Sequence, residues 1–169
     1  VWNTFDIVEQ YKGIAVQSKS GHAFIKDVMR EHNAVYGGEM SAHHYFRDFA
    51  YCDSGMIPWL LTIALLSETE QSLSTLVENM IAKFPCSGEI NFKVADTQAT
   101  VQKIFDHYAD QNPLVDRTDG VSLDFGAWRL NVRASNTEPL LRLNIESRAD
   151  KNPQPMQNYV DELTDLIQG

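Results

Sequence analysis

The chain has 169 residues, of which 43% are hydrophobic, and a formal net charge of −9. This length allows one domain or two small ones, and the hydrophobic share is enough for a packed core. The acidic balance argues against nucleic acid as a partner, since that binding is driven by clustered Lys and Arg. No apolar run reaches the ~20 residues that a membrane span needs, so we expect no membrane association either.

The two cysteines, Cys52 and Cys86, form no C-x-x-C pattern. A reduced, cytoplasmic setting is therefore expected. The sequence also lacks a compact Cys/His cluster of the kind that binds zinc. A small anionic ligand remains compatible with the acidic surface, because charges beyond a Debye length are screened.

Helices and strands alternate in the first half of the chain. A cap at Asn3 or Thr4 predicts a helix that continues to about Tyr11. A short strand is expected at residues 14–17, and apolar spacing predicts a helix at residues 22–31. This alternation predicts a layered α/β portion with a mixed sheet.

The longest apolar run, residues 56–66, predicts a buried helix. Asp53 or Ser54 is the expected cap, and Pro58 would lie in the first turn. A further helix is expected over about residues 72–84.

Residues 84–88 contain a proline and a glycine and predict a linker. We therefore expect a first portion at residues 1–84 and a second domain at residues 85–169. In the second domain, Asp119-Gly120 predicts a hairpin turn. The pattern predicts a small α+β domain with a four-stranded, largely antiparallel sheet and two helices. The expected strands are residues 89–94, 121–125, 128–132 and 140–146, and the expected helices are residues 97–109 and a last one opened by Pro153 or Pro155.

The segment from Gly37 to His43 contains two glycines that permit a turn. Glu39, Ser41 and His43 alternate, so an extended backbone would point all three to one side. A carboxylate, a hydroxyl and an imidazole together suit sugar hydroxyls. An edge strand with a solvated polar face is the alternative interpretation.

The segment from Arg133 to Pro139 combines an arginine, two hydroxyls and a carboxamide. A phosphate needs that combination, namely a bidentate cation and several neutral donors. Because strands are expected on both sides, the segment is predicted to be a loop held on a sheet. A polar turn whose Asn and Ser side chains bond to their own backbone is the alternative.

Together these two segments resemble the α-D-phosphohexomutase family, and most closely its bacterial phosphomannomutase and phosphoglucomutase subgroup. In that family a G-E-M-S-[GA]-H loop of the third domain binds sugar hydroxyls. An R-x-S-N-T-x-P loop of the fourth domain binds the substrate phosphate. Lys19-Ser20-Gly21-His22 is similar to the family's K-T-G-H segment, and Ala42 stands where glycine is commoner. The resemblance covers essentially the whole chain.

The resemblance implies specific roles for these residues. Four would bind the phosphate: Arg133, Ser135, Asn136 and Thr137. Glu39 and Ser41 would bond to sugar hydroxyls, and His43 would support or extend that loop. His22 would be a possible acid or base, since imidazole titrates near neutral pH. Without the resemblance, a histidine after glycine at a helix start is more often a cap or a surface group.

The family moves a phosphoryl group between O1 and O6 of a hexose through a bisphosphorylated intermediate. Its phosphoserine loop, T-A-S-H-N-P, and its magnesium loop, D-G-D-x-D-R, do not occur in this sequence. The resemblance implies a hexose phosphate substrate, glucose or mannose 1,6-bisphosphate as activator or intermediate, and magnesium held elsewhere in the parent protein.

The chain begins without a methionine or a targeting segment. We expect it to be the C-terminal part of a longer enzyme, with N-terminal domains as its partners, and to be inactive alone. The alternative is a stand-alone module that binds a sugar phosphate without catalysis.

Overall fold

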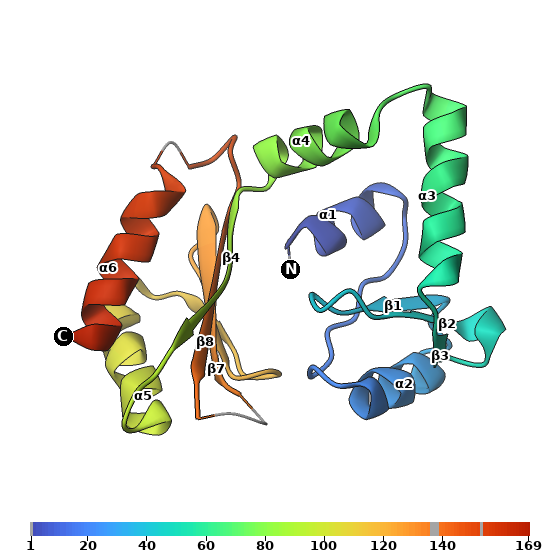
Figure 1. Ribbon diagram of the computed structural model, residues 1–169. Coiled ribbons are helices and arrows are strands. Elements are labelled where there is room, and N and C mark those ends of the chain that lie inside the picture. The colour runs from blue at the N-terminus through green and yellow to red at the C-terminus, as the bar shows by residue number, and fades with distance from the viewer. Residues whose placement is uncertain (1, 136–138, 153) are drawn as a thin grey trace. The chain divides into compact units, whose positions relative to one another are not determined.

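The computed structural model describes residues 2–135, 139–152 and 154–169, and Figure 1 shows the helices and strands that they form. The chain divides into two compact units. One comprises Val16–Glu78, and the other comprises Val1–Ala15 together with Asn79–Gly169. These bounds differ from the boundary expected at residues 84 and 85, which stays a prediction.

The first unit alternates helices with short strands, as the sequence predicts. Its elements are α2 (His22–Glu31), β1 (Tyr36–Gly38), β2 (His44–Phe46), the 3₁₀ turn η1 (Arg47–Phe49), β3 (Cys52–Asp53), α3 (Met56–Thr69) and the start of α4 (Leu73–Lys83). The strands form a sheet in the order β1-β2-β3, and both pairings are antiparallel. The sheet is thus antiparallel rather than mixed, because tight turns join successive strands.

A small core holds α2 against this sheet. Ile25 and Met29 lie four residues apart on one face of the helix, and both are buried. They pack with Tyr45 of β2, whose side chain is 1% exposed. Tyr45 therefore anchors the β1–β2 hairpin to the helix.

Two expectations for apolar segments are wrong. Residues 14–17 form no strand, and Ile14 is 91% exposed. Helix α3 forms where predicted, with Pro58 in its first turn and the hydroxyl of Ser54 accepting from the backbone N–H of Ile57 at 3.3 Å. Yet none of its residues is buried, and Trp59 is 55% exposed. A strand needs a pairing partner and an apolar helix needs a covering surface, which the described residues do not supply.

The second unit is built on a five-stranded antiparallel sheet in the order β4-β8-β7-β6-β5. Its elements are α1 (Trp2–Gln10), β4 (Cys86–Phe92), α5 (Thr97–Tyr108), the 3₁₀ turn η2 (Ala109–Gln111), β5 (Leu114–Asp116), β6 (Val121–Asp124), β7 (Trp128–Ala134), β8 (Leu141–Ser147) and α6 (Met156–Gln168). The predicted α+β domain with an antiparallel sheet is confirmed. The hairpin turn at Asp119-Gly120 joins β5 to β6, and Gly120 has a φ of 72°.

The structure corrects two details at the edges of this sheet. The three-residue strand β5 pairs with β6 and was not expected, because it is short and directly follows Pro113. Residues 86–88, expected as a linker, are the start of β4. A shift in register between Cys86 and Glu89 accommodates the positive φ of Gly88, as in a β-bulge.

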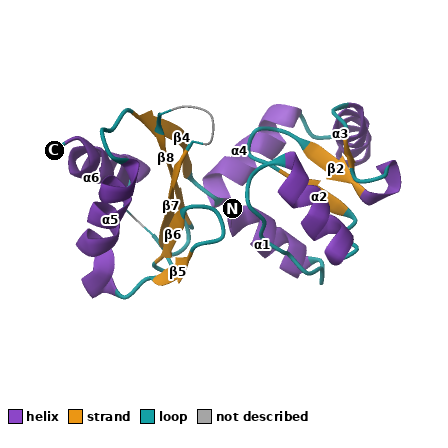
Figure 2. Ribbon diagram, turned by 90° about the horizontal axis from the view of Figure 1, so that it is seen from below, coloured by secondary structure: helices purple, strands orange, loops and turns teal. Residues whose placement is uncertain are grey.

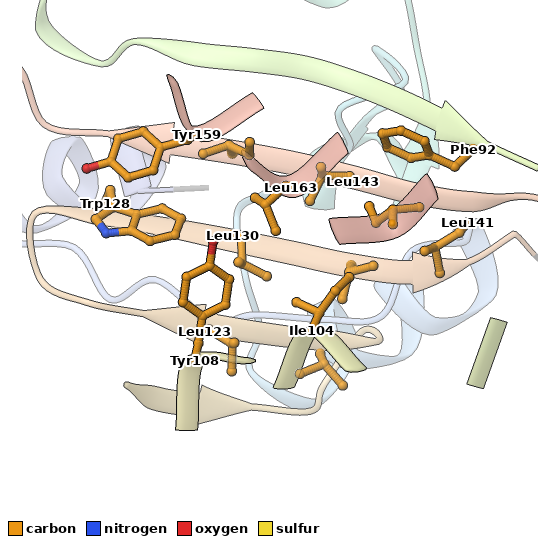
Figure 3. Close-up of a cluster of buried hydrophobic side chains, with 14 residues drawn as sticks. Phe92, Ile104, Tyr108, Leu123, Trp128, Leu130, Leu141, Leu143, Tyr159 and Leu163 are labelled. Atoms are coloured by element: carbon orange, nitrogen blue, oxygen red, sulfur yellow. The ribbon is translucent and has the colours of Figure 1, made fainter. Parts of the chain in front are cut away.

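The two faces of the sheet differ in character. Buried residues alternate with half-buried ones along β8 and along β7 up to its exposed last residue, Ala134, which is the pattern of a strand with one apolar face. Helices α5 and α6 cover the apolar face (Figure 2), and their side chains interdigitate with it (Figure 3). Trp128 stacks there on Phe125 and Tyr159, with ring centroids 4.4 and 4.2 Å away. The opposite face carries the polar residues.

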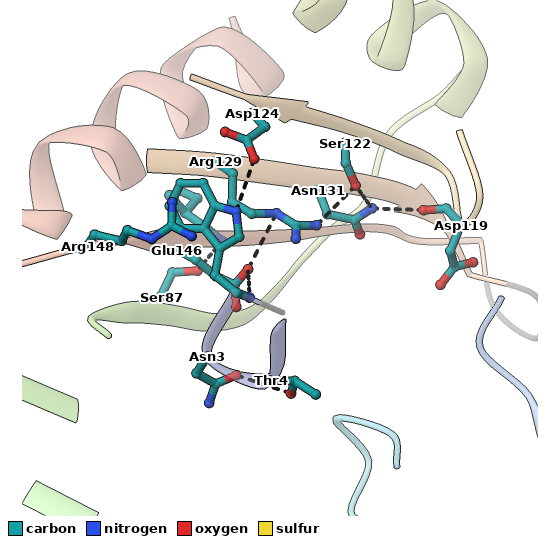
Figure 4. Close-up of polar contacts among 12 residues, drawn as sticks. Asn3, Thr4, Ser87, Asp119, Ser122, Asp124, Arg129, Asn131, Glu146 and Arg148 are labelled. Atoms are coloured by element: carbon teal, nitrogen blue, oxygen red, sulfur yellow. Dashed lines mark hydrogen bonds and ion pairs between the residues drawn. The ribbon is translucent and has the colours of Figure 1, made fainter. Parts of the chain in front are cut away.

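Helix α1 is attached to this polar face (Figure 4). It begins at Trp2, before the expected caps, and the Trp2 indole N–H donates to Asp124 at 3.0 Å. Arg148 donates to both carboxylate oxygens of Asp6, at 2.9 and 3.2 Å, and its guanidinium lies 4.1 Å from the centre of the Trp2 ring. The hydrogen bond from Arg148 lowers the pKa of Asp6.

Candidate functional site

The sugar loop, which we define as residues 39–43, is the tight turn between β1 and β2. The backbone N–H of Glu39 donates to the carbonyl of His43 at 3.0 Å, and that of Ala42 donates to the carbonyl of Glu39 at 3.1 Å. Ala42 has a φ of 63°, in the left-handed region. The loop is therefore not extended, and sequence alternation does not set the directions of its side chains. Ser41 is exposed at the turn.

Glu39 connects the sugar loop to the start of α2. One carboxylate oxygen accepts from the backbone N–H of Gly21 at 2.8 Å, and the other accepts from the hydroxyl of Tyr45 at 2.7 Å. Gly21 has a φ of 124°, which a residue with a Cβ rarely adopts. His22 follows directly as the exposed first residue of α2. The structure thus brings the segment at residues 19–22 and the sugar loop together.

His43 is held by an aspartate that the sequence suggested as a helix cap. Its Nδ1 lies 2.7 Å from Oδ2 of Asp53, and Oδ1 of Asp53 accepts from the backbone N–H of His44 at 3.0 Å. The hydrogen bond that the His43 ring donates to the Asp53 carboxylate raises the pKa of His43 above its ordinary value of 6.5. The same contact lowers the pKa of Asp53, and the hydrogen bond from the backbone N–H of His44 lowers it further.

The neighbouring histidine has a different partner. Nδ1 of His44 lies 2.7 Å from the hydroxyl of Tyr36, while His43 contacts Asp53. Burial raises the pKa of that Tyr36 hydroxyl. The adjacent pair therefore does not converge on one ligand, as expected for consecutive residues entering a strand.

The phosphate loop, which we define as residues 133–139, is the connection between β7 and β8. Arg133 pairs with Arg142 across the two strands, and the backbone N–H of Ser135 donates to the carbonyl of Leu140 at 2.8 Å. The strands expected on both sides of this segment are therefore present, and β7 extends through Arg133 to Ala134, two residues beyond the expected end. Asn136 and Thr137, predicted to bind phosphate, lie outside the described residues.

Arg133 projects from the polar face of the sheet among acidic side chains. Its guanidinium lies 3.3 Å from Glu89 and 3.8 Å from Asp119, and its side chain is 16% exposed. The other carboxylate oxygen of Glu89 lies 3.5 Å from Arg142. Like charges opposite each other on adjacent strands repel, so Glu89 compensates two guanidinium groups at once.

Arg129 lies on the same face, two positions before Asn131 in β7. Its guanidinium lies 3.4 Å from Glu146 and donates to the hydroxyl of Ser122 at 3.3 Å (Figure 4). Asn131 donates to that hydroxyl at 3.0 Å and to the carbonyl of Asp119 at 2.8 Å. These contacts tie Arg129 to the sheet scaffold, away from the strand end where Arg133 lies.

No group of three or more His, Cys, Asp or Glu side chains among the described residues could hold a metal ion. These residues thus do not fit a magnesium site. Within the same residues, no helix is long and apolar enough to cross a membrane.

Comparisons with known proteins identify the family of the chain. A family model for the alpha/beta/alpha domain III of phosphoglucomutase/phosphomannomutase matches residues 2–84, and one for the C-terminal domain matches residues 89–163. The chain belongs to this phosphohexomutase family. It corresponds to the C-terminal portion, domains III and IV.

Named relatives of the family are close in sequence. The chain is 60% identical over 168 residues to a protein of Xanthomonas campestris pv. campestris called "Phosphohexose mutases", covering 99% of this chain and 37% of that protein. It is 55% identical to a phosphomannomutase of Vibrio cholerae serotype O1, covering 98% of this chain and 36% of the relative. The chain thus spans little more than a third of the length of these curated relatives.

A solved structure shares the fold. The crystal structure of a phosphoglucomutase/phosphomannomutase family protein from Burkholderia thailandensis superposes with a TM-score of 0.70 at 21% identity, over 95% of this chain and 34% of that one.

Sequence reasoning missed three residues that organise the loops: Tyr45, Asp53 and Glu89. The role of Asp53 follows from the register of β3 against β2, which places residue 53 opposite residue 45 and which the sequence does not show. For Glu89 the only signal was its acidic side chain at the start of a strand in the same sheet. For Tyr45 the sequence offered only a hydroxyl at a core position, a group that needs a partner when buried.

Proposed function

We propose that this chain is the part of a phosphohexomutase that recognises a hexose phosphate. The sugar loop contacts hydroxyls through Glu39 and Ser41, supported by His43. The phosphate loop binds the phosphate through four residues: Arg133, Ser135, Asn136 and Thr137. The observation that carries this proposal is that the sugar loop is preorganised. The Glu39 carboxylate and the His43 imidazole are each held by hydrogen bonds to residues outside the loop.

Fixed side chains are what a sugar site requires. Each carboxylate oxygen of Glu39 accepts one hydrogen bond from the protein and has a second lone pair for a sugar hydroxyl. Asp53 engages Nδ1 of His43, which leaves Nε2 as the ring atom for a ligand. Side chains that are oriented before binding lose less conformational entropy when the ligand arrives.

The parent enzyme is proposed to interconvert hexose 6-phosphate and hexose 1-phosphate through a bisphosphorylated intermediate. Phosphoryl transfer asks mainly for positioning and charge stabilisation, which suits a division of labour between domains. The reactive phosphoserine and the magnesium ion would be supplied by N-terminal domains, with glucose or mannose 1,6-bisphosphate as activator. The family names of the relatives support this assignment.

His22 is proposed to exchange a proton with a sugar hydroxyl. The hydrogen bond between Glu39 and the preceding residue, Gly21, supports this role, because it ties the start of α2 to the sugar loop. An exposed imidazole beside bound hydroxyls is suited to acid–base chemistry near neutral pH.

A calorimetric titration of the chain with mannose 1-phosphate and glucose 1-phosphate tests the proposal. We expect saturable binding of both sugar phosphates. Inorganic phosphate alone and the unphosphorylated sugar should each bind more weakly. Equal affinity for inorganic phosphate and both sugar phosphates would remove the sugar loop from the site. Absence of binding by a chain whose circular dichroism shows it folded would overturn the recognition role.

The alternative, a stand-alone binding module without catalysis, predicts the same titration. The two differ in the size and activity of the native protein. A native protein about 2.7 times this length that converts mannose 1-phosphate supports the enzyme, since the chain covers 37% of its Xanthomonas relative. A native protein of this length that binds without turnover supports the module.

A further inference from the structure

Tyr45 combines a buried ring with a hydroxyl directed at the sugar loop. Its side chain is 1% exposed, packed with Ile25 and Met29 of α2. Its hydroxyl donates to Glu39 at 2.7 Å, the shortest class of charge-assisted hydrogen bond. A phenylalanine would fill the same volume, so packing alone does not explain the hydroxyl.

We propose that Tyr45 is a positioning residue, which acts on sugar binding by fixing the carboxylate of Glu39. This inference rests on the proposed function and adds a residue that the sugar motif does not contain. Two donors reach different oxygens of one carboxylate, Tyr45 from the core and Gly21 from the start of α2. Two such contacts define both the location and the plane of the carboxylate.

The Tyr45 hydroxyl is a donor at neutral pH. Burial raises the pKa of the Tyr45 hydroxyl well above its usual range, and the bond to Glu39 raises it further. The hydroxyl therefore stays protonated and keeps donating. A free glutamate would populate several rotamers, and fixing them only on binding would weaken the ligand's affinity.

The competing explanation is that Tyr45 contributes packing only. Its ring also lies 5.9 Å below the ammonium of Lys26, a contact that needs the ring and not the hydroxyl. Tyr45→Phe separates these contributions, because it keeps the ring and removes the donor. Tyr51→Phe is the matched control: Tyr51 packs against the same core, and its hydroxyl is 3.5 Å from Asn33.

The test measures steady-state kinetics of the full-length enzyme with mannose 1-phosphate. Tyr45→Phe should raise KM by about 2- to 12-fold, the scale of one net hydrogen bond, with kcat nearly unchanged. Tyr51→Phe should stay within about twofold of the parent. In a Glu39→Ala background Tyr45→Phe should have no further effect on kcat/KM, since its target is gone.

The outcomes separate this inference from the proposed function. The positioning role would be overturned if Tyr45→Phe left KM unchanged. It would also be overturned if the effects of Tyr45→Phe and Glu39→Ala on kcat/KM were additive. Unchanged kinetics of Glu39→Ala itself would overturn the sugar-binding role of Glu39. Circular dichroism and Tm of each variant check folding. Should Glu39→Ala not fold, Glu39→Gln takes its place: its amide accepts on one oxygen only, so the effect of Tyr45→Phe must shrink there.

Discussion

The acidic neighbours of Arg133 lead to a prediction in which one substitution, Glu89→Gln, strengthens phosphate binding but lowers the stability of the fold. Glu89 lies 3.3 Å from Arg133 and 3.5 Å from Arg142. A phosphate bound by Arg133 must compete with this carboxylate and is repelled by it. Glu89→Gln should therefore tighten phosphate binding, whereas Arg133→Ala should weaken it.

The magnitudes follow from the exposure of the groups. Losing a charge-assisted bidentate contact costs about 1.5–3 kcal/mol, so Arg133→Ala should weaken phosphate binding by about 10- to 150-fold. The Arg133–Glu89 pair is 16% and 31% exposed, and ion pairs open to water are worth about 0.2–1 kcal/mol. Releasing Arg133 from Glu89 should thus tighten binding by at most about fivefold.

Stability should change in the other direction. Glu89→Gln leaves Arg133 and Arg142 opposite each other on adjacent strands with less compensation. We expect a lower Tm without ligand and a larger rise in Tm on adding phosphate than in the parent protein. A purely structural ion pair would lower Tm and leave the phosphate-induced rise unchanged.

The assay is calorimetry in the full-length enzyme, with thermal unfolding in parallel. Arg129→Ala is the control, because Arg129 lies on the same face but contacts Glu146 and Ser122. It should leave phosphate affinity nearly unchanged. Equal losses for Arg133→Ala and Arg129→Ala, or weaker binding by Glu89→Gln, would refute the reasoning.

Four further predictions concern the chain alone and the sugar loop. The chain alone should show no turnover in a coupled assay with mannose 1-phosphate and a bisphosphate activator; activity above a no-enzyme control would contradict this. Glu39→Gln should lower kcat/KM for mannose and glucose substrates by similar factors while the fold survives, and a loss confined to one epimer would argue against contacts to shared hydroxyls. Ala42→Gly should raise the free energy of unfolding by about 0.5–1 kcal/mol, measured with denaturant, because glycine relieves the left-handed φ of 63° at some cost in chain entropy. Asp53→Asn should lower the NMR titration midpoint of His43, since Asp53 raises the pKa of His43 above 6.5 and the pKa of Asp53 is itself below 3.8. The ion pair stabilises the fold fully between pH 3.8 and 6.5. This contribution is lost as pH rises through the pKa of His43 or falls through the pKa of Asp53.

The sequence predicted the strands that flank the phosphate loop because their signals are local. Strand β7 alternates apolar and polar residues over its seven positions and β8 over its first six, and the two strands pair with each other. Pattern and chain proximity together place Arg133 at the end of a strand. The partners of Arg133 could not be found in the same way, since Glu89 reaches it from β4, more than forty residues earlier.

The sugar loop shows the same limit within a shorter stretch of chain. The motif identified Glu39 and His43, but not what holds them. Asp53 reaches His43 only because a short hairpin return places β3 beside β2. Tyr45 reaches Glu39 only because its ring is anchored in the core under the turn. Both contacts depend on register and packing, which residue types alone do not determine.

The errors at residues 14–17 and at α3 share one physical origin. An apolar pattern reports that a segment gains free energy by burial, but burial also needs a surface that covers it. In α3 the apolar residues surround the whole helix, so no orientation against a single neighbour could bury them all. Ile14 and Trp59 accordingly remain exposed among the described residues. Exposed apolar area of this kind is where contact with another polypeptide would yield the most stabilisation, about 25 cal/mol for each Å² removed from water.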